Sequence, residues 1–371
     1  MPQDSESRFS RRKFLRRTAG SAAALGAAPA FLSSCRAAEF EKGSSIHPNL
    51  DELRVVGVHD DAMTDGDRGR ISWEQQEERV NWDPVQTNMD RMACALAEEE
   101  DPEKAWKAIF VKPPNKNWSD VVVAIKSNHI FVQRSRSAVV SKLCHALTDV
   151  VGVKGENIFL YDACHGDKMS TNTQFEGLPD GVHLANKWGG FQAEVTVARP
   201  YFDGSRTTKC MKHLATDEVD ILVDLALCKG HNMTYGGFTM AMKNHFGTFN
   251  PRLGHQEQGA NYLIGINKTP HVLGKMDDRG RVTFPRQQIC LVDALWGSDP
   301  GPSGTSTHQL NRLYMAPTAP ALDYQVATKL RQQEMGWQTN RGMARKFLTS
   351  FGYSPDQLPN NGEIIDALEY A

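Results

Sequence analysis

The sequence lacks the features that identify several large classes of protein. Its 371 residues contain seven cysteines and no C-x-x-C pair, which argues against zinc ribbons and cysteine-ligated iron–sulfur motifs. No apolar run approaches the ~18 residues that a membrane-spanning helix needs. The 42 basic and 44 acidic residues nearly cancel, so no basic excess is present to bind nucleic acid. With 40% hydrophobic and 23% charged residues, the composition is that of an ordinary globular chain.

Residues 1–38 have the composition of an export signal. Residues 10–16 read SRRKFLR, close to the twin-arginine pattern, and residues 18–31 form a short alanine-rich stretch. Residues 32–35 read LSSC and fit a lipobox, in which Cys35 is acylated and becomes the mature N-terminus. Residues 28–30, which read APA, are an alternative cleavage site.

This signal predicts partners and a location. We expect the twin-arginine translocation machinery as a partner, a periplasmic or cell-envelope location, and membrane contact only through a lipid anchor on Cys35. The twin-arginine route carries folded proteins, often because a cofactor is inserted in the cytoplasm. A metal or a metal-containing cofactor loaded before export is therefore one expectation, and its identity stays open.

After the signal, the pattern predicts an α/β domain with two flanking segments. Residues 39–105 read as an irregular N-terminal extension, residues 106–335 as the α/β domain, and residues 336–371 as a helical tail with helices over 341–351 and 362–370. Continuous apolar runs at 108–111, 120–125, 157–161, 219–227 and 288–293 predict buried strands. Helical spacing over 137–150 completes a βαβ unit. We expect a mostly parallel sheet with flanking helices.

Polar residues, all but one of them ionisable, lie at the ends of four of these strands. They are Lys126, Asn128, Asp162, His165, Lys229, His231 and Asp293. Ligands of open parallel sheets bind beyond the carboxyl ends of the strands, so convergence of four such ends predicts a binding site there. We expect the site to take a small anionic ligand or a metal-containing cofactor.

His165 and His231 are predicted to carry the chemistry of this site. Histidine transfers protons near neutral pH and binds borderline metals, and a pair on neighbouring strand ends could act as acid and base on two faces of one substrate. The alternative is two half-buried loop histidines that are hydrogen-bonded to backbone. Residues 236–244 read GGFTMAMKN, a glycine-led segment that brings Lys243 and Asn244 toward the same site. The segment is neither a Walker loop nor a G-x-G-x-x-G motif.

These motifs resemble the family called domain of unknown function 362. The stretches that carry the resemblance are Lys126–Asn128, Asp162–Ala163, residues 229–247 (KGHNMTYGGFTMAMKNHFG), Asp293 with residues 301–304 (GPSG), and Asp323. The resemblance covers residues 106–335 and implies an α/β fold with its site at these residues. The family has no settled activity, and Ser127 stands where its pattern has proline.

A fainter resemblance is to the nickel-pincer lactate racemases. It implies that His165 and His231 form an acid–base pair, that Lys243 anchors the cofactor, and that His245 or His255 binds nickel. Residues 240–242 read MAM where that group is glycine-rich, which departs from the pattern. A racemase or epimerase is therefore an option, not the leading hypothesis.

The sequence does not decide whether the chain is an enzyme. The leading hypothesis is an exported protein that binds a small anionic molecule or cofactor and performs acid–base chemistry on it. One alternative is a non-catalytic, lipid-anchored binding protein. Another is an envelope assembly factor that recognises a protein through the acidic segment 60–78.

Overall fold

The computed structural model describes residues 39–66, 70–130, 132–162, 174–186, 194–198, 206–255 and 259–370. The chain divides into a segment of residues 1–37 and a compact unit of residues 38–371, and all the described residues belong to the second. The predicted export signal with Cys35, and the candidate catalytic residue His165, lie outside the described residues.

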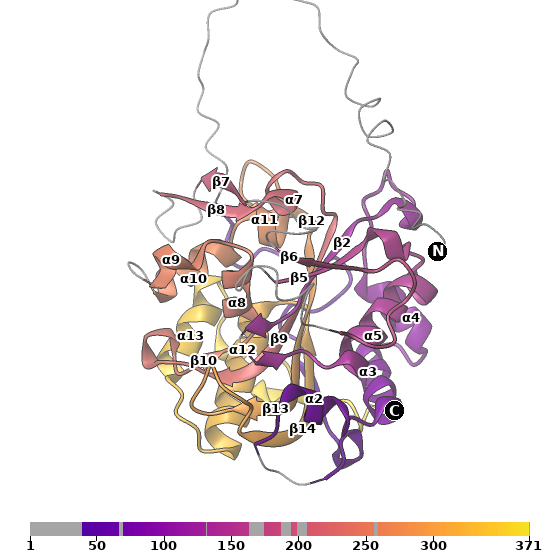
Figure 1. Ribbon diagram of the computed structural model, residues 1–371. Helices are drawn as coiled ribbons and strands as arrows, with labels where there is room; N and C mark the ends of the chain where they lie inside the picture. The colour runs from indigo at the N-terminus through magenta and orange to yellow at the C-terminus, as the bar shows by residue number, and fades with distance from the viewer. Residues whose placement is uncertain are drawn as a thin grey trace, which may run out of the picture. The chain divides into compact units, whose positions relative to one another are not determined.

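A nine-stranded sheet forms the centre of the compact unit (Figure 1). Its order is β15-β1-β14-β13-β9-β2-β5-β6, with β10 added to β9. The strands are β1 (Val56–His59), β2 (Val123–Lys126), β5 (Ile158–Asp162), β6 (His183–Asn186), β9 (Ile221–Gly230), β10 (Phe238–Thr239), β13 (Gln287–Ser298), β14 (His308–Ala316) and β15 (Ile365–Asp366). From β13 to β6 the strands are parallel, whereas β14 is antiparallel to both of its neighbours. The predicted α/β fold with a mostly parallel sheet is confirmed.

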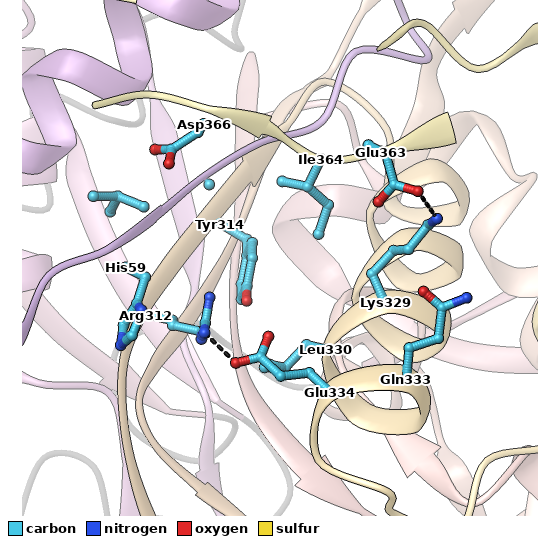
Figure 2. A pocket seen from close by; sticks show the side chains of 12 residues that line it. His59, Arg312, Tyr314, Lys329, Leu330, Gln333, Glu334, Glu363, Ile364 and Asp366 are labelled. Atoms are coloured by element: carbon cyan, nitrogen blue, oxygen red, sulfur yellow. Dashed lines mark hydrogen bonds and ion pairs between the residues drawn. The ribbon is translucent and has the colours of Figure 1, made fainter. Parts of the chain in front are cut away.

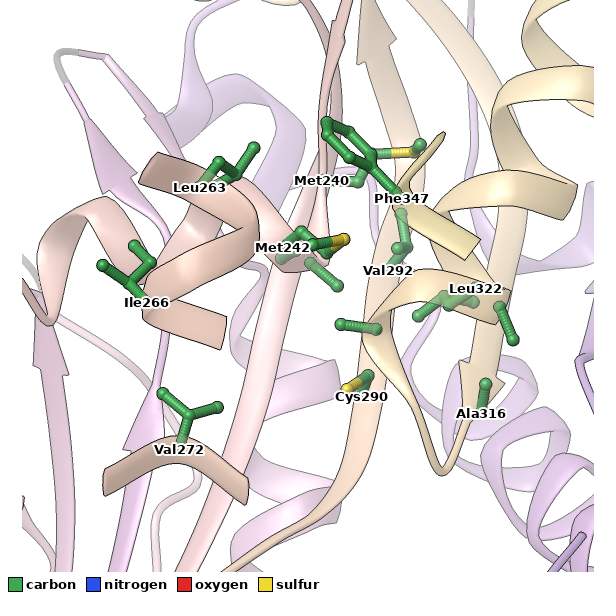
Figure 3. Close-up of a cluster of buried hydrophobic side chains, with 14 of the residues drawn as sticks. Met240, Met242, Leu263, Ile266, Val272, Cys290, Val292, Ala316, Leu322 and Phe347 are labelled. Atoms are coloured by element: carbon green, nitrogen blue, oxygen red, sulfur yellow. The ribbon is translucent and has the colours of Figure 1, made fainter. Parts of the chain in front are cut away.

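Helices cover both faces of the sheet because its strands are apolar on both faces. One face packs against α3 (Trp82–Ala97), α4 (Pro102–Ile109) and α5 (Ser137–His145), and the π-helical segment η3 (Ala146–Val151) continues α5. The other face packs against α8 (Ala241–Asn244), α10 (Ala260–Asn267), α11 (Pro270–Leu273), α12 (Ala319–Gln325) and α13 (Arg341–Ser350). Figure 3 shows the core of this second face, where the sheet residues Cys290 and Val292 meet Met242 and Leu322.

Smaller elements surround the sheet. They are η1 (Asp61–Met63), α2 (Trp73–Glu77), the pair β3 (His129–Ile130) and β4 (Gln133–Arg134), the pair β7 (Glu194–Ala198) and β8 (Thr207–Met211), α7 (Lys212–Ala215), η5 (Met233–Tyr235), η6 (His245–Gly247), α9 (Pro251–Leu253), the pair β11 (Gly274–Met276) and β12 (Val282–Pro285), and the π-helical segment η8 (Val326–Glu334) after α12. Within the described ranges, no helix has both the length and the apolar character needed to cross a membrane.

Two expected elements are wrong. The expected strand at 108–111 does not form, and residues 108 and 109 instead end α4. The Asp101 side chain starts this helix by accepting hydrogen bonds from Glu103 N and Lys104 N, and Pro102 is its first residue. The expected helix over 362–370 does not form. Asn361 and Gly362 have φ of 54° and 78°, which a right-handed helix does not allow, and β15 follows them.

The two flanking segments take part in the same sheet. The extension supplies β1, and the tail supplies α13 and β15, which pairs with β1 in parallel. Residues from the extension, such as Met89, also share a hydrophobic cluster with strand residues such as Val223. The flanking segments are therefore structural parts of the α/β unit.

Candidate functional site

The carboxyl ends of β2, β5 and β9 bring three predicted site residues together. Lys126 is the last residue of β2, Asp162 is the last of β5, and Lys229 lies one residue before the end of β9. Lys126 Nζ lies 3.3 Å from Asp162 Oδ1, and their side chains are 1% and 2% exposed. A buried lysine and a buried carboxylate tolerate removal from water only as such a pair.

Asn244 of α8 is the centre of a buried polar network. Its Oδ1 accepts hydrogen bonds from Lys126 Nζ (2.9 Å) and Asn128 Nδ2 (3.0 Å). Its Nδ2 donates to Asp224 Oδ1 (2.7 Å) and to the Lys126 carbonyl (3.0 Å). Asn128 Oδ1 in turn accepts from Lys229 Nζ at 2.6 Å. One amide therefore fixes the geometry of two strand ends and of both lysines.

Gly247 explains part of the glycine pattern in residues 229–247. A Cβ atom at this position would overlap both Asp162 Oδ1 and Lys126 Cε. Only glycine lets the backbone after α8 pass this close to the ion pair.

His245 lies next to Asp224 of the network and is fully buried. Its Nε2 lies 2.6 Å from Gln287 Oε1, and its Nδ1 lies 3.0 Å from Thr248 Oγ1. An amide oxygen only accepts, so Nε2 carries the proton and Nδ1 accepts from the threonine hydroxyl. Burial lowers the pKa of His245 to about 3 and raises the pKa of nearby Asp224 well above its usual value. Both groups are therefore biased toward their neutral forms.

A second group of side chains surrounds Lys243, and we call it the aromatic–lysine cluster. It comprises His231, Tyr235, Lys243, Phe246 and His255. Lys243 Nζ lies 4.8 Å from the Tyr235 ring centroid and 4.2 Å from that of Phe246, within cation–π range. The rings of His231 and His255 are nearly parallel, with centroids 6.5 Å apart.

His231 is a neutral histidine with an unsatisfied nitrogen. Burial, and next the charge of Lys243, lower its pKa to about 3. Its Nδ1 is buried and has no hydrogen-bond partner. A buried polar atom without a partner costs roughly 1–3 kcal/mol, and such atoms in folded proteins call for an explanation such as a bound ligand. Lys229 of the Asn244 network is two residues before His231, so the two groups adjoin at the end of β9.

The sequence indicated His255 only as an alternative nickel ligand. Tyr235 OH donates to the Gly254 carbonyl at 3.0 Å and lies 3.2 Å from His255 Nδ1. Because the carbonyl takes the only hydroxyl proton, His255 Nδ1 must donate to the tyrosine oxygen, and its Nε2 is left with a lone pair. Burial and the charge of Lys243 lower the pKa of His255 as well. The only available sequence signal was its position shortly after residues 229–247.

Asp293 lies apart from both groups. Its Oδ2 accepts from Arg136 N at 2.8 Å and lies 3.5 Å from Arg136 Nη1, with both side chains at most 1% exposed. Glu77 accepts from the next backbone N–H, that of Ser137, with both carboxylate oxygens at 3.1 Å. Burial raises the pKa of Glu77 to about 7. These carboxylates satisfy the first amides of α5.

Residues 299–304 lie against the end of β9. The backbones of Gly230 and Gly301 are so close that a Cβ atom on either would overlap the other residue. Arg331, fully buried on η8, donates to Asp299 Oδ1 (2.8 Å) and to the Gly237 carbonyl (3.3 Å). Asp323 accepts from Ala241 N at 2.8 Å and so caps the start of α8.

The predicted metal ligands do not form a group in the described ranges. His245 contacts Gln287 and Thr248, whereas His231 contacts Tyr235 and His255. No three His, Cys, Asp or Glu side chains in the described part of the chain are placed to hold a metal ion. His165 lies outside that part, so its metal-binding and catalytic roles stay predictions.

Comparison with known families gives one match. A family model described as "Domain of unknown function (DUF362)" matches residues 123–328, just over half of the chain. The match runs from β2 into η8 and includes the Asn244 network and the aromatic–lysine cluster. Neither the curated proteins nor the solved structures contain a match to this chain.

Proposed function

The chain belongs to the DUF362 family, and from the geometry of its strand ends we propose that it binds a small anionic molecule and performs acid–base chemistry on it. The observation that carries the proposal is the unpartnered Nδ1 of neutral His231 beside the cationic Lys243. An ammonium group attracts an anionic ligand. The negative charge of a bound anion would raise the lowered pKa of His231, so that its neutral imidazole can take a proton from that ligand.

The charges of the described site favour an anion. Lys126, Lys229 and Lys243 supply three positive charges near the strand ends. Asp162 pairs with Lys126, and burial biases Asp224 toward its neutral form. These lysines place positive charge at the strand ends, which attracts a ligand of opposite sign.

Exposure divides the predicted site residues into two roles. Lys126, Lys229 and Asn244 are at most 3% exposed, so they position their neighbours and shape the field. His231 and Lys243 are partly exposed, and they are the groups proposed to touch the ligand. His255, with a lone pair on Nε2, is a second proton acceptor in the described site. His165 stays the residue that the sequence predicts as the acid–base partner of His231.

Calorimetric titration of the mature chain with lactate, malonate and inorganic phosphate tests the binding. At least one anion is expected to bind, and His231→Gln and Lys243→Gln are expected to weaken it by about tenfold or more. Lys104→Gln removes an exposed lysine of α4 and serves as the matched control. Absence of binding for all three anions, or equal binding by all the variants, contradicts the proposal.

Solvent exchange separates an enzyme from a binding protein. Proton NMR in D₂O would follow exchange of the hydrogens next to the carboxylate of bound lactate or malonate. The wild type is expected to exchange them faster than buffer, and His231→Gln is expected to lose this rate while keeping part of the affinity. Binding without faster exchange would instead support the non-catalytic binding protein.

We also propose export by the twin-arginine route, with a lipid anchor on Cys35. The support is the SRRKFLR and LSSC segments of the sequence. Replacing Arg11 and Arg12 by lysine should retain the chain in the cytoplasm, and Cys35→Ala should release it from the membrane fraction. Elemental analysis of the exported chain tests whether a metal is loaded before export.

A further inference from the structure

A pocket lies on the sheet face, away from the carboxyl ends of β2, β5 and β9. It has a volume of about 410 Å³ and lies between β1, β14, the segment around β15 and η8 (Figure 2). Its apolar lining comes mainly from Tyr314, Leu330 and Ile364. Gly57 makes this lining possible, because a Cβ atom there would lie 2.6 Å from Tyr314 Cδ1. The volume is within the range typical of small-molecule sites.

Charges of both signs stand around this apolar lining. Arg312 pairs with Glu334, and Lys329 pairs with Glu363. Figure 2 shows the two pairs separated across the pocket, with Tyr314 and Ile364 between them. The carboxylates are 47% and 60% exposed, whereas the cations are 18% and 23% exposed.

This arrangement selects for one class of ligand. A ligand with a single charge would be attracted by one member of an ion pair and repelled by the other member. The attraction and the repulsion would largely cancel. A zwitterion can place its ammonium group at a carboxylate and its carboxylate group at a cation. An apolar side chain on that zwitterion would cover the apolar lining and lose its exposure to water.

The π-helical segment η8 connects this pocket to the strand ends. Its residues Lys329, Leu330 and Glu334 line the pocket. Arg331, from the same turn, donates to the Gly237 carbonyl at 3.3 Å. That carbonyl also accepts from His231 N at 3.0 Å, so one oxygen joins η8 to the backbone of His231. π-helical turns are rare and are frequently found at functional sites.

We propose that this pocket binds a free amino acid with an apolar side chain and that Arg331 transmits its occupancy to the strand ends. The proposal stands independently of the anion-binding function proposed above. Binding at the pocket would fix the η8 turn, and the contact of Arg331 with the Gly237 carbonyl would then stabilise the segment that carries His231.

Calorimetric titration of the mature chain with L-leucine, L-methionine and L-phenylalanine tests the site. At least one is expected to bind, and its N-acetyl and methyl-ester derivatives, which carry one charge, are expected to bind about tenfold more weakly or less. Glu334→Gln and Glu363→Gln should each weaken binding, whereas Glu369→Gln, an exposed change that does not line the pocket, should not. The site is overturned if none of the three amino acids binds at roughly 10 mM, because any Kd would then lie above that concentration. Unchanged binding by both pocket variants overturns it equally.

Hydrogen–deuterium exchange tests the connection. The bound amino acid is expected to slow exchange in residues 229–238, and Arg331→Lys is expected to keep binding but lose this effect. Should Arg331→Lys fail to fold by circular dichroism, Asp299→Asn weakens the same anchoring of Arg331 from the other side. Binding that leaves exchange in 229–238 unchanged in the wild type contradicts transmission through Arg331.

Discussion

Replacement of Asn244 by leucine removes the polar atoms at the centre of the buried network and keeps the branched shape of the side chain. Asn128 Nδ2 would lose its hydrogen bond to Asn244 Oδ1, and Asp224 Oδ1 would lose its bond from Asn244 Nδ2. Lys126 Nζ would keep the Ser127 carbonyl and Asp162. Each buried polar group left without a partner costs roughly 1–3 kcal/mol, so two of them predict a loss of about 4 kcal/mol in the free energy of unfolding.

Urea denaturation followed by tryptophan fluorescence measures this loss. A chain with a stability of about 5–15 kcal/mol would still fold, with its midpoint moved to lower urea. The matched control is Asn267→Leu, because Asn267 is also buried but donates only to the Met242 and Leu263 carbonyls. A loss below about 1 kcal/mol for Asn244→Leu, or one no larger than that of the control, would refute the role of Asn244 as the centre of the network.

Three further predictions concern buried titratable groups and a close backbone contact. Burial raises the pKa of Glu77 from 4.5 to about 7, so the folded chain holds this proton to higher pH than the unfolded chain does. The free energy of unfolding should therefore fall by about 3 kcal/mol as pH rises through that window. Glu77→Gln should flatten this part of a urea–pH series, and an unchanged slope contradicts the prediction. The pKa values of His231 and His245 are lowered to about 3, so both rings should stay neutral in ¹H–¹⁵N NMR spectra down to about pH 4, and stability that depends on their neutral forms is lost as pH falls from 6.5 toward 3. Titration of either ring near pH 6.5 would show that it is not desolvated. Gly247→Ala should cost about 2 kcal/mol or more in thermal or urea denaturation, because its Cβ overlaps the Lys126–Asp162 pair. Gly342→Ala, at an exposed position of α13, should cost about 0.5 kcal/mol or less, because its Cβ meets only the Asn340 side chain. Equal effects would refute the close contact.

The sequence predicted the fold class well because its signal is local. Continuous apolar runs mark strands that are buried on both faces, and four of the five expected strands form in the sheet. The fifth, at 108–111, failed because a short apolar run also suits a buried helix, and the cap at Asp101 decided the outcome.

The candidate site was predictable in part. Lys126, Asp162 and Lys229 meet because the ends of parallel strands share one edge of the sheet. Asp293 also belongs to a predicted strand, but its side chain lies on the face that packs against α5, and the sequence does not give the register that decides this.

Other features depend on contacts between distant segments. The pocket beside η8 brings together residues near positions 57, 314, 330 and 364, and no local pattern links them. The tautomer of His255 depends on a hydroxyl 20 positions earlier in the chain. Such features follow from the packing of the helices on the sheet, which residue patterns do not specify.

A crystal of the protein soaked in selenate tests whether an anion binds at the strand ends, because selenium locates a bound anion by its anomalous signal. A selenium peak is expected in contact with Lys243 Nζ and the His231 ring, and it should be lost in crystals of Lys243→Gln. Peaks at surface lysines alone, with none in the aromatic–lysine cluster, would contradict the claim that the strand ends bind an anion.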